Sequence, residues 1–369
     1  MHRGFPFAPL ALAASLVLAG CCERDRPPVV PAPDAAAGDT PQETRALQVV
    51  EERFVSAMTP EDNIDSPASW TTPDGAVWVF ATAKSTDRLV VYDGDTGETL
   101  RHVGARGTGD GEFVRPNGIA VADDLLFVVE RDNRRVQVFA LPGLEHRATF
   151  GADELVKPYG LWVQRTDEGH ELYVTDSYET DAGEVPPLAE LDRRVHRYAL
   201  LADGDALRAE HRGHFGDTGE AGALRVVESI WGDPAHDRLL IAEEDESYAN
   251  ELKVYTLDGR FAGVTVGGDV FQAQAEGIAL RECGDGGWWL TTEQGKESTV
   301  FHLFDRASLA HVGAVTGAKV ANTDGIWLGG PSRAFPDGVL YAVHDDQGLV
   351  AFDWRDIAAA LDLPACPAA

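Results

Sequence analysis

Polar and acidic side chains recur at two positions of this sequence, before one short apolar stretch and at the end of the next. The first position precedes a small residue and an apolar run, and it holds Asp65, Asn117, Tyr159, Glu228, Glu276 and Asp324. The second ends a later apolar run, in Ala83-Lys84, Glu130-Arg131, Asp176-Ser177, Glu243-Glu244, Glu293-Gln294 and His344-Asp345. Carboxylates that converge repel one another unless they are protonated or paired with cations.

Oxygen donors of this kind favour calcium. Calcium takes six to eight oxygen ligands with loose geometry, whereas zinc prefers nitrogen and sulfur ligands in a tetrahedron. If the recurring positions meet in space, they predict a calcium-binding rim. Lys84 and Arg131 are basic exceptions, and they either clamp an anion beside the metal or form ordinary ion pairs, Arg131 with Glu130 or Asp132.

Other catalytic signals are absent from the sequence. There is no serine nucleophile elbow, no phosphate loop and no Cys-x-x-Cys motif. The histidines lack metal or triad spacing, so we expect surface or loop positions for His170, His196, His211, His214, His302 and His311.

The elements that position these residues form a sixfold repeat. Each unit has a first strand that begins at the polar position, a second strand, and a third strand that ends in an aromatic residue. The second strands are expected at residues 79–82, 127–129, 172–175, 239–242, 289–292 and 340–343. The third strands end at Tyr92, Phe139, Tyr198, Tyr255, Phe304 and Phe352, which lie 47, 59, 57, 49 and 48 residues apart. This period predicts an all-β fold, a six-bladed β-propeller with four-stranded blades over residues 46–369.

Three segments lie outside the regular repeat. Residues 46–58 supply the outer strand that closes the ring, or form a short helix. Tyr178 to Glu190 reads as a surface loop over one face, and Trp354 to Leu363 as a short terminal helix.

The N-terminus predicts export and a lipid anchor. Residues 1–20 have an apolar run of signal-peptide length that ends in Leu18-Ala19-Gly20-Cys21, which resembles the bacterial lipoprotein processing box. Cys21 would then be the acylated first residue, and the proline-rich residues 21–45 a disordered tether to the cell envelope. Export permits a disulfide between Cys283 and Cys366, but the sequence leaves that pairing open.

The charge limits the partners. A formal charge of -30, from 61 acidic and 31 basic residues, argues against nucleic acid as a partner. We also expect the protein to be a monomer.

The ordered motifs resemble those of the β-propeller phytases, calcium-dependent phosphatases of inositol hexakisphosphate. The match runs from about Asp65 to Leu363, through Asp65-Ser66-Pro67-Ala68-Ser69-Trp70, Ile241-Ala242-Glu243-Glu244-Asp245-Glu246, Glu276-Gly277-Ile278, Gln294-Gly295, Thr323-Asp324-Gly325-Ile326 and Phe335-Pro336-x-Gly338. The resemblance implies calcium ligands at Glu228, Glu244, Glu276 and Asp324, with Asp65 in the opening motif beside them. It implies that Lys84, Arg131 and Tyr159 contact the substrate phosphate and, with Glu244, form the catalytic set.

Three departures from that family remove charge from the expected site. Ser66 replaces a second aspartate, residues 115–120 replace an Asn-Asn-Val-Asp-x-Arg stretch, and Ser177-Tyr178 replaces a Lys-Glu pair. The sequence therefore predicts weak activity on phytate and favours simpler phosphate esters.

Two local resemblances keep other functions open. Residues 109–113 through 133–139 are similar to an NHL repeat, and Asn117-Gly118 is similar to the calcium-ligand asparagine of six-bladed lactonases. The alternatives to a calcium-dependent phosphoric monoester hydrolase are a lactonase- or esterase-like propeller, in which one metal polarises a carbonyl, and a non-catalytic calcium-stabilised binding propeller.

Overall fold

The computed structural model describes Met1 and residues 47–203, 206–245 and 247–366. The expected signal segment, the tether and Cys21 lie outside these residues. Among the described residues, no helix is long and apolar enough to cross a membrane.

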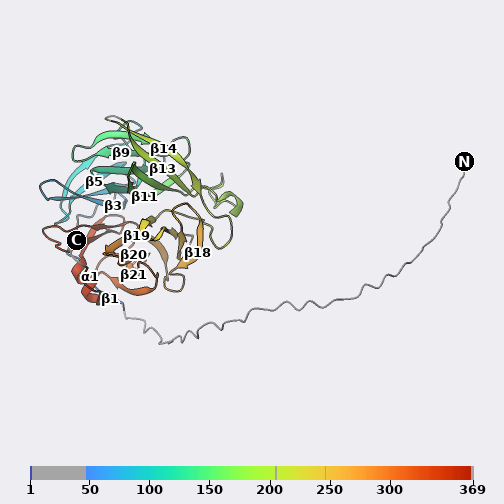
Figure 1. Ribbon diagram of the computed structural model, residues 1–369. Coiled ribbons are helices and arrows are strands. Elements are labelled where there is room, and N and C mark those ends of the chain that lie inside the picture. Colours follow the sequence, from blue (N-terminus) through green and yellow to red (C-terminus); the bar gives the residue numbers. More distant parts are fainter. Residues whose placement is uncertain (2–46, 204–205, 246, 367–369) are drawn as a thin grey trace, which may run out of the picture. The chain divides into compact units, whose positions relative to one another are not determined.

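The described chain forms a six-bladed β-propeller with four-stranded antiparallel blades, which confirms the predicted fold (Figure 1). Within each blade the strands follow one another from the axis outwards. Blade one contains β3 (Ile64–Thr71), β4 (Val77–Ala83), β5 (Arg88–Asp93) and β6 (Thr99–Val103). Blade two contains β7 (Pro116–Ala122), β8 (Leu125–Glu130), β9 (Arg135–Ala140) and β10 (Glu145–Phe150). Blade three contains β11 (Pro158–Thr166), β12 (Gly169–Asp176), β13 (Val195–Asp203) and β14 (Ala206–Phe215).

The second half of the chain repeats this order. Blade four contains β15 (Ile230–Asp233), β16 (Arg238–Glu243), β17 (Glu251–Tyr255) and β18 (Phe261–Val266). Blade five contains β19 (Gln274–Cys283), β20 (Gly286–Gln294), β21 (Val300–Asp305) and β22 (His311–Thr316). Blade six contains β23 (Ile326–Gly329), β24 (Val339–His344) and β25 (Gly348–Asp353).

The N-terminal segment of the propeller closes the ring. β2 (Phe54–Val55) pairs antiparallel with β25 as the outer strand of blade six, which confirms the outer-strand interpretation of residues 46–58 over the helical one. β1 (Gln48–Val49) pairs in parallel with β22 and adds a fifth strand to blade five. Because the last blade combines both ends of the described domain, the ring has no seam held by side chains alone.

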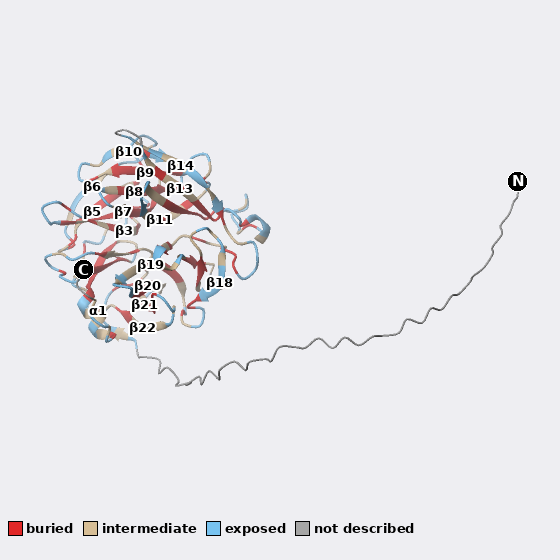
Figure 2. Cartoon of the chain, in the orientation of Figure 1, coloured by how far each residue is buried: buried red, intermediate tan, exposed pale blue. Residues whose placement is uncertain are grey.

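The core lies between blades. Middle strands are buried on both faces, because each blade is covered by its two neighbours (Figure 2). In β4, for example, the successive residues Val79, Phe80 and Ala81 are all fully buried. One face packs with blade six, where Tyr341 and Val343 lie, and the other packs with blade two. The second strands therefore read as continuous apolar runs.

The C-terminal segment is fixed to blade five. The helix α1 (Trp354–Ala360) begins at Asp353, whose side chain accepts a hydrogen bond from the Arg355 backbone N–H. Cys366 forms a disulfide with Cys283 at the end of β19, with a Cα–Cα distance of 5.0 Å. The pairing that the sequence left open is thereby confirmed.

Candidate metal centre and adjoining basic pocket

A repeated backbone irregularity aims the recurring polar residues at the axis. The innermost strands of blades one, two, three and five each contain a register shift against the second strand. The residues inside these shifts are Asp65-Ser66, Asn117-Gly118, Tyr159-Gly160 and Glu276-Gly277. In blades four and six, Glu228 and Asp324 stand two residues before the inner strand. Register shifts like those in blades one, two, three and five are β-bulges, which re-orient side chains and are frequent beside functional sites.

Bonds between neighbouring blades hold the axial residues close together. The backbone N–H of Gly277 donates to Asp324 O at 2.9 Å, and that of Gly325 donates to Asp65 O at 2.9 Å. A side-chain hydroxyl makes the corresponding bond elsewhere, since Thr175 Oγ1 donates to Glu228 O at 2.9 Å. A small residue is required at these contacts, because a Cβ on Gly160 would lie 2.1 Å from Glu228 O.

Three glutamates form the core of the candidate metal centre. One carboxylate oxygen from each of Glu228, Glu244 and Glu276 lies within 4.8 Å of the other two. Glu244 Oε1 accepts a hydrogen bond from the Ser229 backbone N–H, whereas Glu244 Oε2 is buried without a hydrogen-bond partner. Asp65, Tyr159, Glu228, Glu276 and Asp324 line a cavity of about 60 Å³ at the axis. That volume accommodates an ion with a few waters.

Lys84 lies inside this cluster. Its Nζ is 2.7 Å from Asp65 Oδ1 and 3.2 Å from Asp324 Oδ2, and the side chain is only 8% exposed. Tyr159 Oη donates to Asp65 Oδ1 at 3.3 Å, and Gln294 Nε2 donates to Asp324 Oδ1. Lys84 thus neutralises two aspartates, and its expected contact with a substrate phosphate stays a prediction that would require these ion pairs to open.

The electrostatics of the cluster favour a bound cation. Burial, followed by the charge of Asp65, raises the pKa of Glu228 to about 8. Burial, followed again by Asp65, raises the pKa of Asp324 to about 7. Burial and the neighbouring carboxylates hold the pKa values of Glu244 and Glu276 well above their usual range. A cation that replaces these protons would relieve the repulsion.

These donors fit calcium. They are carboxylate oxygens with a phenol oxygen nearby, they carry more negative charge than Lys84 balances, and one buried oxygen lacks a partner. Calcium prefers hard oxygen ligands of this kind in flexible number.

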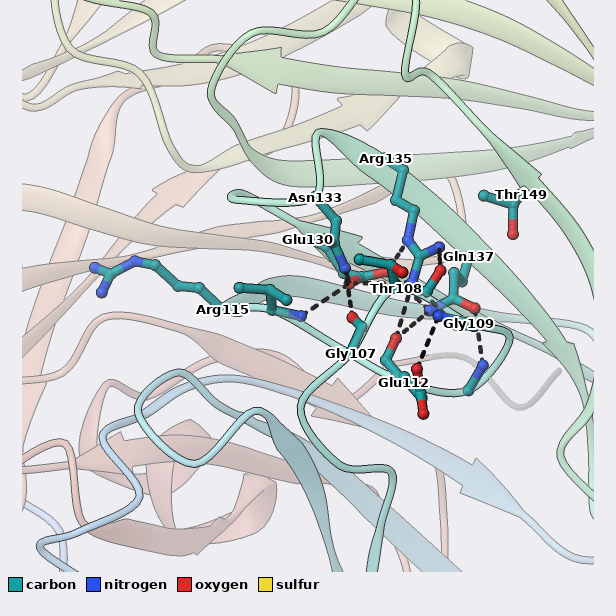
Figure 3. A network of polar contacts seen from close by, with 12 residues as sticks. Gly107, Thr108, Gly109, Glu112, Arg115, Glu130, Asn133, Arg135, Gln137 and Thr149 are labelled. Carbon is teal, nitrogen blue, oxygen red and sulfur yellow. Dashed lines mark hydrogen bonds and ion pairs between the residues drawn. The ribbon is translucent and has the colours of Figure 1, made fainter.

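The second-strand ends divide into two sets. Lys84, Glu244 and Gln294 face the axial cluster, as described above. In blades two to four, the first residue of each pair is acidic and does not face the cluster. Its carboxylate instead accepts hydrogen bonds from the segment that leads into the inner strand. Glu130 accepts from the Val114 backbone N–H, Asp176 from those of Val156 and Lys157, and Glu243 from those of Arg225 and Val226. Figure 3 shows Glu130 held by Asn133, Arg135 and Gln137.

A second cavity adjoins the acidic one. It has a volume of about 280 Å³ and shares Tyr159 and Glu228 with the axial cavity. Five basic side chains line it, Arg115, Arg131, Lys157, Arg194 and Arg225, against the acidic Glu179 and Glu228. The expected surface loop supplies part of its wall, through Tyr178, Glu179, Gly183 and Val185.

The basic residues differ in how many of their N–H donors already have partners within the protein. Arg194 is buried and donates to four backbone carbonyls, so it serves as a brace. Arg131 Nε donates to Asp132 Oδ1 at 2.7 Å, an exposed pair that the sequence had raised as an alternative to anion binding. Lys157 pairs with Glu179. Arg115 Nε is buried without a hydrogen-bond partner. Arg225 Nη1 is likewise buried without a partner, although Arg225 Nη2 pairs with Glu220 at 2.8 Å. Arg115, Arg131 and Arg225 therefore keep donors that could bind an anion.

Sequence reasoning missed most of this basic pocket. Arg115 and Lys157 stand two residues before the axial residue of their blades, and Arg225 stands three before Glu228. The other three blades have Asn63, Gln274 and Asn322 two residues before theirs. Extending the repeat alignment two or three residues upstream would have shown a basic side to the rim at blades two to four.

The histidine expectation is wrong for two residues. His196 and His302 lie within β13 and β21, and their exposed fractions are 2% and 5%. His196 moreover gathers with His211 and His214 into a cluster on blade three.

Comparison with known proteins finds a family model that matches part of this chain. A family model described as a 6-bladed beta-propeller, DUF5128, matches residues 40–194. No curated protein matches the chain. Virginiamycin B lyase from Staphylococcus aureus is 10% identical over 80% of this chain and 97% of its own, with a TM-score of 0.48. The calcium-binding protein regucalcin from Agrobacterium tumefaciens is 13% identical over 82% of this chain and 94% of its own, with a TM-score of 0.49. Such similarity is confined to the general fold.

Proposed function

We propose that the protein is a calcium-dependent hydrolase of small phosphoric monoesters. The observation that carries this proposal is the junction of two cavities of opposite charge. The acidic axial cavity and the basic pocket share Tyr159 and Glu228, so a cation in the first would lie next to an anion in the second. The β-propeller phytase resemblance of the sequence implies the same chemistry.

The basic pocket supports an anionic substrate. On a chain with a formal charge of -30, an anion is repelled except where basic side chains reverse the local field. The pocket volume of about 280 Å³ is at the lower limit for ligand sites. It therefore favours a simple monoester over inositol hexakisphosphate, in agreement with the charges lost at Ser66 and Ser177.

The residues of the site would take different roles in the reaction. Glu228, Glu244 and Glu276 would hold calcium, with Asp324 and Asp65 beside them. Calcium at this position would neutralise phosphate charge and lower the pKa of a nearby water.

Arg131 and Arg115 would hold the phosphoryl oxygens from the opposite side, where donors stabilise the charge that develops on transfer. Glu244 would contribute to catalysis by holding the ion, because its Oε2 is buried and unpaired while its Oε1 accepts from the Ser229 N–H. Tyr159, on the wall shared by the two cavities, can orient the ester.

Phosphate release tests the proposal. We would assay p-nitrophenyl phosphate, glycerol phosphate and phytate with calcium and with chelator. Glu276→Gln should lower calcium affinity and turnover together, because it removes an anionic ligand but keeps the side-chain shape. Arg131→Gln should lower turnover by about 100-fold or more and leave calcium affinity unchanged. Arg147→Gln, on the exposed outer strand of blade two, is the matched control and should change neither.

The alternatives would give different results. If calcium-loaded protein released no phosphate from any ester while Glu276→Gln still lost calcium, the phosphatase proposal would fail. A calcium-stabilised binding propeller would then account for the site, and hydrolysis of lactones or carboxylic esters would instead support a lactonase-like function.

We also propose that the protein is exported and anchored at the cell envelope through Cys21. The processing motif Leu18-Ala19-Gly20-Cys21 supports this, and so does the Cys283–Cys366 disulfide, because disulfides persist in oxidising compartments outside the cytosol.

A further inference from the structure

Three histidines on the outer strands of blade three bring their imidazole nitrogens together. His196 lies on β13, and His211 and His214 lie on β14. One ring nitrogen from each lies within 4.8 Å of the other two, and His196 Nδ1 is 3.2 Å from His211 Nε2. Nitrogens bound to one tetrahedral Zn²⁺ at about 2.0–2.1 Å would be about 3.3 Å apart. We propose that His196, His211 and His214 form a second metal site, separate from the axial one, for Zn²⁺ or a similar divalent transition metal.

A β-bulge creates this cluster. Residues three apart on a regular strand point to opposite faces, so His211 and His214 would normally diverge. The pairing of β13 with β14 shifts register between Arg197 and Tyr198: Arg197 pairs with Gly213 and Tyr198 with His211. Arg212 is the extra residue, and it allows both β14 histidines to lie against His196.

The buried histidine has a carboxylate behind its ring. When His196 Nδ1 binds a metal, Nε2 must carry the proton. That Nε2 is buried without a hydrogen-bond partner, and it faces Asp176 Oδ2 at 3.6 Å. Histidine ligands commonly donate their other ring N–H to a carboxylate, which fixes the tautomer and the ring orientation.

The two outer histidines leave the cluster open to solvent. His211 and His214 are exposed, so an ion would retain an open position for water or another ligand.

Blade five provides an internal comparison. His302 Nδ1 lies 3.1 Å from His311 Nε2, and His302 Nε2 lies 3.0 Å from Glu293 Oε2. This repeats the relation of His196 to His211 and Asp176. The residue paired with His302 is Ala314, however, whereas His214 pairs with His196. The histidine pair with its carboxylate is thus a feature that two blades share, and the third nitrogen distinguishes blade three.

The site also connects with the basic pocket. Asp176, behind His196, accepts the backbone N–H groups of Val156 and Lys157, and Lys157 lines the pocket wall. A bound ion would therefore fix the outer edge of blade three and the carboxylate that positions Lys157.

Zinc titration of the purified, metal-stripped chain tests the proposal. Excess calcium is kept in the buffer so that the axial glutamates are occupied. We expect one Zn²⁺ per chain, and Co²⁺ in its place should give the visible absorption of a tetrahedral nitrogen site. His214→Ala, which converts blade three to the blade five arrangement, should weaken Zn²⁺ binding by at least about tenfold. His311→Ala in blade five is the matched control and should leave Zn²⁺ affinity unchanged.

Three results would overturn the proposal. They are a folded wild-type chain that binds no Zn²⁺, equal Zn²⁺ affinity in wild type and His214→Ala, and Zn²⁺ affinity that falls in Glu276→Gln but not in His214→Ala. The last result would place the zinc at the axis. Because His214 is exposed, its alanine variant should fold, and His211→Ala provides an independent second variant.

Discussion

The axial carboxylates should make the calcium-free protein less stable as the pH rises. Burial and neighbouring charge raise the pKa of Glu228 from 4.5 to about 8 and that of Asp324 from 3.8 to about 7. Between about pH 4.5 and pH 8 the folded protein therefore keeps protons that the unfolded chain has already lost. The stability that these protons contribute is fully present below the unfolded pKa, and it is lost as the pH rises through the folded pKa.

The size of the effect follows from the shifts. For Glu228, the change from 4.5 to about 8 corresponds to about 5 kcal/mol at 1.36 kcal/mol per pKa unit. Asp324 interacts with the same charges, so its contribution overlaps with that of Glu228 and is not added. For a domain of this size, 1 kcal/mol shifts the melting temperature by about 1.5 °C. The range from pH 5 to pH 8 contains about 3.5 kcal/mol of this effect, because it starts above the unfolded pKa and ends at the folded one. We therefore expect the melting temperature to fall by about 5 °C from pH 5 to pH 8 in chelator.

Calorimetry at the two pH values, with chelator and with calcium, measures this fall. Calcium at a hundredfold excess over its Kd contributes about 2.7 kcal/mol, so it should restore about 4 °C at pH 8 and less at pH 5, where protons compete. Glu228→Gln should flatten the pH dependence, whereas Glu61→Gln, at an exposed position before β3, should leave it unchanged. A melting temperature that is constant or rises from pH 5 to pH 8 in chelator would refute this reasoning.

Three further predictions concern the frame and the anchor. Cys283→Ser should lower the free energy of unfolding by about 4.5 kcal/mol, because the disulfide closes a loop with a sequence separation of 83 residues; denaturant unfolding measures this, and equal stability would contradict it. Gly160→Ala should destabilise the blade three–blade four contact and weaken calcium binding, since its Cβ would lie 2.1 Å from Glu228 O, whereas Gly330→Ala, which has open space, should not. Cys21→Ser should abolish lipid labelling and release the chain from the membrane fraction; continued labelling would rule out Cys21 as the anchor.

The sequence contained enough information to predict the fold and the axial residues. The aromatic ends of the third strands, from Tyr92 to Phe352, established the number of blades, because each blade repeats the same packing between neighbours. Residues at one repeat position must converge in a closed ring, which is why Glu228, Glu276 and Asp324 could be placed together.

The sequence did not reveal local backbone geometry. Glu243 and Glu244 are adjacent, yet Glu243 braces backbone N–H groups and Glu244 faces the axis, because neighbouring strand residues point to opposite sides. Lys84 could not be distinguished from a free anion-binding group, since its pairing with Asp65 depends on the tight bulge in β3. The histidine cluster depends on one bulge in β14, which strand periodicity does not predict.

A crystal structure obtained near pH 7.5 with calcium and inorganic phosphate tests the central claim most directly. We predict anomalous density for calcium between the carboxylates of Glu228, Glu244 and Glu276, with oxygen ligands at about 2.3–2.6 Å. We predict phosphate in the adjoining pocket, within hydrogen-bond distance of Arg115 or Arg131. An axial cavity without calcium at saturating concentration, or a phosphate bound only elsewhere on the surface, would contradict the account.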